Sequence, residues 1–133
     1  MTALSIIPAV AIVTVSWCSQ YAPGVMDTVI ANRQDWGQIP FDLSAWDGFV
    51  AVPDCEDIGQ TYYIRQLNAT NRQWLRVLAV DCAGKYDRQS DDDARSGYEW
   101  MRDNGIAFEV GYETASRWER VGQGIRCEWT RGE

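Results

Sequence analysis

Carboxylic acids are the side chains of this sequence best suited to acid–base chemistry. The 133-residue chain has 19 aspartates and glutamates but no histidine, so neither imidazole catalysis nor a histidine metal site is possible. A carboxylic acid can protonate a leaving oxygen, and clustered carboxylates raise one another's pKa so that one of them stays protonated. The first question is therefore which carboxylates the fold brings together.

The overall charge restricts the partners of the chain. With only 12 lysines and arginines, the formal net charge is −7, which repels nucleic acid and anionic lipid surfaces. The basic residues are scattered along the sequence, and none of them form the basic stripe that follows a phosphate backbone. We expect no nucleic-acid partner.

Four cysteines, Cys18, Cys55, Cys82 and Cys127, are spread over the whole chain. Zinc ligands usually occur in close pairs, and the sequence has no CxxC motif, so two disulfides are favoured over a zinc site. Four cysteines allow three pairings, and four buried free thiols in a reducing compartment are the alternative. We expect no metal and no other cofactor.

The N-terminus is apolar over residues 3–15 but does not have the features of a signal peptide. It lacks a basic region, contains Pro8, and has no clear small-residue cleavage site. It is also too short to span a bilayer, so we expect no membrane insertion. The alternation of larger and smaller side chains over residues 11–18 predicts a first β-strand instead.

The remaining pattern predicts a single, mainly β domain over residues 1–133. A composition of 46% hydrophobic and 23% charged residues is typical of one globular core. Runs rich in β-branched and aromatic residues predict further strands. Their ranges are 26–31, 48–52, 61–66, 74–80, 106–110 and 124–129. Residues 32–46, which contain Trp36 and Trp46, are predicted to form a long irregular loop.

Two short helices are predicted in the second half of the chain. Ser90 is a suitable N-cap for a helix over 91–103, with three aspartates in its first turn and Asn104–Gly105 at its end. This helix makes residues 85–105 an acidic insertion. The second helix is predicted over 112–118.

Several short motifs occur in an order that resembles a known superfamily. They are GFVAVPD at 48–54, EDIGQ at 56–60, AVDCAG at 79–84, AFEVG at 107–111, YETASRW at 112–118 and GIRCEW at 124–129. This series resembles the 3D-domain branch of the double-psi β-barrels, which is shared with membrane-bound lytic transglycosylase A and related to rare lipoprotein A and expansins. The resemblance implies a six-stranded double-psi β-barrel with two short helices.

The resemblance also implies a set of carboxylates. The family is named for three aspartates that converge on a groove, and Asp54 and Asp81 match two of them, whereas Ala107 occupies the third position. Glu109 lies two residues further along the strand, so it shares a face with Ala107 and can reach the same groove. We therefore predict Asp81 as the acid/base, Glu109 as stabiliser or alternate acid, and Asp54 in support. The alternative for Asp81 is a hydrogen bond to its own turn, and for Glu109 a solvated strand position.

The same resemblance suggests how the cysteines pair. Cys55 and Cys82 follow Asp54 and Asp81, which the family brings together, so a Cys55–Cys82 bridge is expected. Cys18 on the first strand is then left for Cys127 on the last.

By resemblance, the chain is expected to bind a cell-wall glycan such as peptidoglycan, with or without lytic transglycosylase-like cleavage, outside the cell or in its envelope. Sugar rings can stack on aromatic faces, and Trp36 and Trp46 are the predicted contacts, whereas Trp17, Trp74, Trp118 and Trp129 are expected to pack inside. The alternative is a non-catalytic assembly module of a virion or cell-surface lattice, which would self-associate. An enzyme needs convergent carboxylates in a cleft, whereas an assembly module would bury that surface against a neighbour.

Overall fold

The computed structural model describes residues 12–86, 88–120, 122 and 124–132. Most of the apolar N-terminal segment, including the first residue of the predicted first strand, lies outside these ranges. In the part of the chain that is described, no helix is both long and apolar enough to cross a bilayer.

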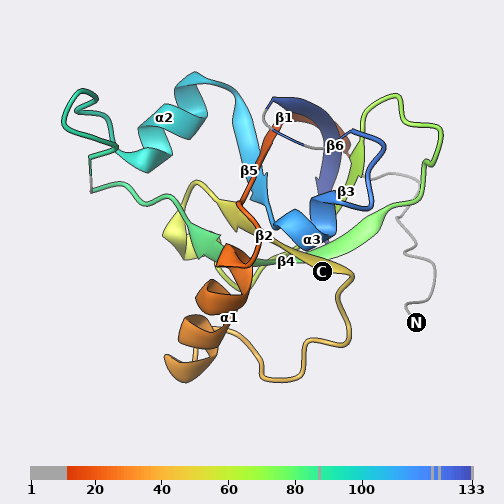
Figure 1. Ribbon diagram of the computed structural model, residues 1–133, viewed down its shortest axis with the longest axis horizontal. Coiled ribbons are helices and arrows are strands. Elements are labelled where there is room, and N and C mark those ends of the chain that lie inside the picture. Colours follow the sequence, from red (N-terminus) through yellow and green to blue (C-terminus); the bar gives the residue numbers. More distant parts are fainter. Residues whose placement is uncertain (1–11, 87, 121, 123, 133) are drawn as a thin grey trace.

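Six strands close into a barrel, which confirms the prediction of a mainly β fold (Figure 1). Around the barrel they follow the order β1-β5-β2-β4-β3-β6. Two neighbouring pairs, β1 with β5 and β2 with β4, are parallel, and the other four are antiparallel. The strands are β1 (Thr14–Gln20), β2 (Gly48–Val52), β3 (Thr61–Gln66), β4 (Leu75–Cys82), β5 (Ile106–Val110) and β6 (Ile125–Arg131).

Alternate residues of the strands fill the barrel. Val50, Ile64 and Val77 are fully buried in one core cluster because successive strand residues point to opposite faces. Phe108 packs edge-to-face against Tyr62 and Trp129 in that cluster, with ring centroids 5.0 and 5.3 Å apart. Such aromatic contacts add about 1 kcal/mol each to the free energy gained by burial.

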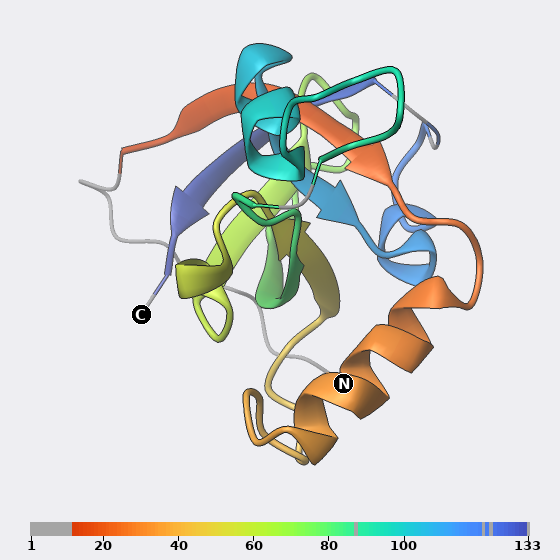
Figure 2. The ribbon, with the colours of Figure 1, turned by 90° about the vertical axis from the view of Figure 1, so that its left-hand side faces the viewer.

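Helix α1 (Val25–Asp35) replaces the strand predicted over residues 26–31. The prediction of a strand rested on the β-branched residues of this segment and was wrong. The segment is helical because a helix packs its apolar residues against the barrel. Met26, Val29 and Ile30 have the i, i+3, i+4 spacing of one helix face, and they cover Leu78 and Val80 on the outside of β4. Figures 1 and 2 show α1 on the opposite side of the barrel from α2.

Both predicted helices are present but shorter. Helix α2 (Gly97–Asp103) has its N-cap at Ser96, and not at Ser90 as predicted, because Ser96 and Glu99 form a capping box. In it, Ser96 Oγ accepts from the Glu99 N–H and the Glu99 carboxyl accepts from the Ser96 N–H. The three aspartates at 91–93 therefore precede the helix. Helix α3 is limited to Tyr112–Ala115.

Both predicted disulfides are formed. Cys18–Cys127 connects β1 to β6, with α-carbons 6.1 Å apart. Cys55–Cys82 connects the 3₁₀ turn η1 (Cys55–Asp57) to the end of β4, with α-carbons 4.9 Å apart. All four cysteines are therefore bridged.

The tryptophans of the regular elements are not all inside. Trp118 and Trp129 pack against the barrel core, and Trp74 is half-buried beneath the Arg65 guanidinium, 4.0 Å from its ring centroid. Trp17 is 40% exposed, so the prediction that it packs inside was wrong. Its side of β1 faces solvent.

Candidate functional site

Strand pairing places two of the predicted carboxylates on either side of one alanine. Ala51 on β2 is the register partner of Asp81 on β4 and of Glu109 on β5. Because Val50 and Val110 point into the core, Ala51 and Glu109 point to the outer face of the barrel. The α-carbons of the two acidic residues are therefore separated by two strand spacings, about 10 Å.

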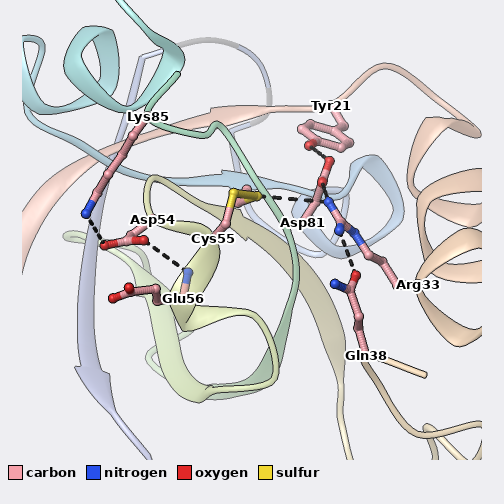
Figure 3. The surroundings of a disulfide bond; sticks show 9 residues. Tyr21, Arg33, Gln38, Asp54, Cys55, Glu56, Asp81 and Lys85 are labelled. Atoms are coloured by element: carbon pink, nitrogen blue, oxygen red, sulfur yellow. Dashed lines mark hydrogen bonds and ion pairs between the residues drawn. A yellow bond between two sulfur atoms is a disulfide. The ribbon is translucent and has the colours of Figure 1, made fainter. Parts of the chain in front are cut away.

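Asp81 is anchored by two side chains from distant parts of the sequence (Figure 3). Its Oδ1 accepts a hydrogen bond from Arg33 Nη2 at 2.7 Å, and its Oδ2 accepts one from the Tyr21 hydroxyl at 2.7 Å. The side chains of this ion pair are only 17% and 19% exposed. Asp81 thus bonds to Tyr21, which follows β1, and to Arg33 of α1, and not to its own turn. Both of its carboxylate oxygens act as acceptors.

The fold positions these two anchors precisely. Tyr21 directly follows β1, and its N–H donates to the Val110 carbonyl at 2.8 Å. Arg33 lies in the last turn of α1, and its Nη1 donates to Gln38 Oε1 at 2.7 Å. Helix α1, which the sequence pattern failed to predict, therefore brings the cation to Asp81.

Glu109 has a different environment from Asp81. It is half-buried, and its carboxyl group forms no hydrogen bond or ion pair with any residue in the described part of the chain. Burial, followed by the negative charge of Asp81, raises the pKa of Glu109. Burial and the hydrogen bond to Asp81 likewise raise the pKa of Tyr21. Unequal environments of this kind separate a proton donor from a charged partner in carboxylate pairs.

Asp54 does not join this pair. It caps η1 by accepting the Glu56 N–H at 3.0 Å, and it forms an ion pair with Lys85 at 3.0 Å. These two contacts lower the pKa of Asp54. Figure 3 shows Asp54 and Asp81 on opposite sides of the Cys55–Cys82 disulfide, each directed toward its own partner.

A bulge beside Ala107 interrupts the two-residue alternation of side chains along β5, from which Glu109 was predicted to share a face with Ala107. The register between β1 and β5 steps from Trp17–Ile106 to Cys18–Phe108, which leaves Ala107 without a partner on β1. A bulge of this kind interrupts the two-residue period. The position of Glu109 is therefore set by its pairing with Ala51 and Ser19, and not by its distance from Ala107.

The two tryptophans predicted to contact sugar rings, Trp36 and Trp46, have different environments. Trp36 follows α1 and is 65% exposed, with the Arg33 guanidinium 5.4 Å from its ring centroid. Trp46 is half-buried, and its Nε1 donates to Thr61 Oγ1 at 3.1 Å. Of the two, only Trp36 therefore contacts a partner of Asp81, namely Arg33. We call the surface formed by Tyr21, Arg33, Trp36, Asp81 and Glu109 the carboxylate face.

Sequence reasoning missed Tyr21 and Arg33. A signal for Arg33 was present, because Met26, Ile30 and Arg33 follow a helical spacing that places all three on the side facing the barrel. No comparable local pattern marked Tyr21.

Within the described ranges, no group of three or more acidic or cysteine side chains is arranged to hold a metal ion. Comparisons of the chain with protein-family models, with curated protein sequences and with solved structures found no match.

Proposed function

We propose that this barrel binds a cell-wall glycan, peptidoglycan in particular, on the carboxylate face. The observation that carries the proposal is the pair of unequal carboxyl groups, Asp81 and Glu109, together with the exposed ring of Trp36, which lies against the same Arg33 that binds Asp81. A sugar ring offers an apolar face for stacking on an indole and hydroxyl groups that donate to carboxylates.

The double-psi assignment belongs to the same proposal. The closed barrel with two parallel strand pairs and the motif order along the chain support it. The bridge expected from the resemblance, Cys55–Cys82, is also consistent with it. Two disulfides fit an oxidising compartment, so we place the domain outside the cell or in its envelope.

The pKa of Glu109 favours cleavage as a second function of the same face. In this scheme Glu109 donates its proton to the glycosidic oxygen as the bond between that oxygen and the anomeric carbon breaks. The Asp81 carboxylate faces the positive charge that develops on the sugar. A hydroxyl of the same sugar then attacks the anomeric carbon and gives its proton to the Glu109 carboxylate. This step forms the anhydro-sugar end of the product and restores the protonated Glu109.

Co-sedimentation with purified peptidoglycan tests the binding proposal. We expect the parent protein to sediment with the polymer, and Trp36→Ala to reduce the bound fraction at least about tenfold, because truncation of a stacked aromatic removes a dominant contact. Trp74→Ala is the matched control, since Trp74 immediately precedes the opposite end of β4 from Asp81. Failure of the parent to sediment, or equal losses in both variants, contradicts glycan binding at this face; the assembly alternative then remains.

Product analysis tests the cleavage step separately. Glu109→Gln keeps the shape of the side chain but removes its titratable proton, so it should lower release of anhydro-sugar products by a factor on the order of 10² while the protein still sediments with the polymer. Asp81→Asn should lower release as well. Equal release by the parent and Glu109→Gln eliminates Glu109 as the acid, and binding without any release by the parent limits the function to binding.

A further inference from the structure

A second cleft lies apart from the carboxylate face. A hollow of about 470 Å³ is bordered by the β3–β4 connection and by the segment after α3, and a smaller one of about 160 Å³ reaches toward the start of α1. Asp47 and Arg117 line both hollows, so the two adjoin. We call them together the Asp47–Arg117 cleft. None of the residues of the carboxylate face lines it.

Asp47 and Arg117 have opposite charges but do not form an ion pair with each other. Asp47 uses Oδ2 to accept the Arg76 N–H at 2.8 Å, which fixes the carboxylate and leaves Oδ1 without a partner among the described residues. The Arg117 guanidinium is exposed and forms no hydrogen bond or ion pair with any of the described residues. One anion and one cation in the same cleft are thus available to a ligand.

The wall of the larger hollow is held in place by internal contacts. Gln66 is 6% exposed, and its amide donates to the Arg120 carbonyl at 3.2 Å and accepts the Glu119 N–H at 3.1 Å. Glu119 in turn accepts the N–H groups of Thr70 and Asn71, which fixes the β3–β4 connection. A preformed site of this kind loses little conformational entropy when a ligand binds.

The exposed rim and the floor of the larger hollow offer contacts suited to a peptide. The side-chain amides of Asn71 and Gln73 lie on the rim. Asn71 Oδ1 accepts the Gln73 N–H at 3.0 Å, so the NH₂ group of Asn71 is the one offered to a peptide backbone, whereas the Gln73 amide can both donate and accept. Leu75 and Trp118 supply apolar surface, and Trp118 also packs against the barrel core. The volume of about 470 Å³ is within the usual range for a small ligand.

We propose that the Asp47–Arg117 cleft binds a short peptide that carries both an ammonium and a carboxylate group. Asp47 receives the ammonium group and Arg117 the carboxylate, while Asn71 and Gln73 bond to the peptide backbone. A polyanion is disfavoured, because Glu113 and Glu119 also line the cleft. The inference does not depend on glycan binding at the carboxylate face.

Titration calorimetry with three peptides tests this proposal. The probe is Ala-Glu-Lys-Ala with both termini blocked, so that its only charges are those of Glu and Lys. One companion peptide carries acetyl-lysine in place of Lys, and the other carries Gln in place of Glu. We expect the parent protein to bind the probe at least about tenfold more tightly than either companion, since each loses one charge-assisted hydrogen bond.

Two variants assign the charges to their partners. Asp47→Asn can still accept the Arg76 N–H, and it should bind the probe and the acetyl-lysine peptide equally. Arg117→Gln should bind the probe and the Gln peptide equally. Asp92→Asn and Arg102→Gln, exposed elsewhere on the surface, are controls for the change in net charge and should bind the probe as the parent does. Amide NMR spectra check that each variant is folded.

The outcomes separate this inference from the glycan proposal. Glu109→Gln should leave peptide affinity unchanged, even if it abolishes glycan cleavage. The inference is overturned if the parent does not bind the probe at millimolar concentration, or if Asp47→Asn and Arg117→Gln discriminate among the peptides as the parent does. It is also overturned if these two variants bind the probe normally but no longer sediment with peptidoglycan, because the cleft is then a sugar subsite.

Discussion

Asp81 and Glu109 flank the same residue, Ala51, from neighbouring strands on either side. Their separation is therefore fixed by the hydrogen-bonded ladder of the barrel and not by loops. A pair held on strands keeps its geometry more precisely than one held on loops. The two carboxyl groups differ in their hydrogen bonding, because Arg33 and Tyr21 bind Asp81 and not Glu109.

The raised pKa of Glu109 predicts how stability depends on pH at this position. Burial and Asp81 disfavour the charged form in the folded state, so the folded protein binds more protons than the unfolded chain between the two pKa values. Glu109 therefore destabilises the fold as the pH rises through that window. Glu109→Gln should be more stable than the parent at pH 7, and this difference should disappear below about pH 4. Urea unfolding at both pH values measures it, and a parent that is the more stable protein at pH 7 contradicts the assignment.

Glu128 should show the opposite dependence on pH. Burial raises its pKa, but hydrogen bonds from Arg72 and Arg65 outweigh burial, and the net pKa is lowered. The stabilisation is present above the unfolded pKa and is lost as the pH falls through the folded one. Glu128→Gln should therefore cost about 1–3 kcal/mol at pH 7 and less in acid. Unfolding curves with the same loss at pH 7 and pH 3 rule out this network as the cause.

Tyr21 and Arg33 should act together through Asp81. Tyr21→Phe removes a hydrogen bond to a half-buried charged group and should destabilise the fold by about 1–2 kcal/mol. Arg33→Gln removes the other anchor. Because the two contacts share one carboxylate, the double variant should differ from the sum of the singles by at least about 0.5 kcal/mol. Additive free energies of unfolding argue against a shared role.

The two disulfides should contribute unequally to stability. In the chain-entropy view, a bridge contributes more when it closes a longer loop, and the separations are 109 residues for Cys18–Cys127 and 27 for Cys55–Cys82. Replacing both cysteines by serine should cost about 5 kcal/mol for the first bridge and about 3.5 kcal/mol for the second. Thermal unfolding of the two double-serine variants gives the comparison, and a larger loss for Cys55–Cys82 contradicts the entropic explanation.

Local patterns predicted most of the barrel. Strands β2, β3 and β5 have the same bounds as the predicted ranges 48–52, 61–66 and 106–110. In each case a run of β-branched and aromatic residues is bounded by turn residues. The α1 segment has the composition of a strand, and only its packing on β4 shows that it is a helix. Ser90 and Ser96 are both good caps by residue type, but only Ser96 has a glutamate three residues later.

The candidate site was predictable only in part. Motif order made Asp81 a candidate, and the spacing from Ala107 made Glu109 one. The contacts of Asp81 span 48 residues to Arg33 and 60 to Tyr21, and no local pattern encodes pairings so distant. Asp54 precedes its cysteine as Asp81 does, yet the adjacent turn η1 directs it to Lys85. Disulfide proximity therefore did not imply proximity of the neighbouring carboxylates.

The most direct test of the glycan proposal is a chemical-shift map of the ¹⁵N-labelled protein titrated with chitohexaose, an oligomer of N-acetylglucosamine. We predict that the largest shifts occur at the Trp36 indole and at the backbone amides of Ala51, Asp81 and Glu109, whereas the Trp74 indole stays unchanged. The absence of saturable shifts, or shifts confined to residues outside the carboxylate face, contradicts glycan binding there.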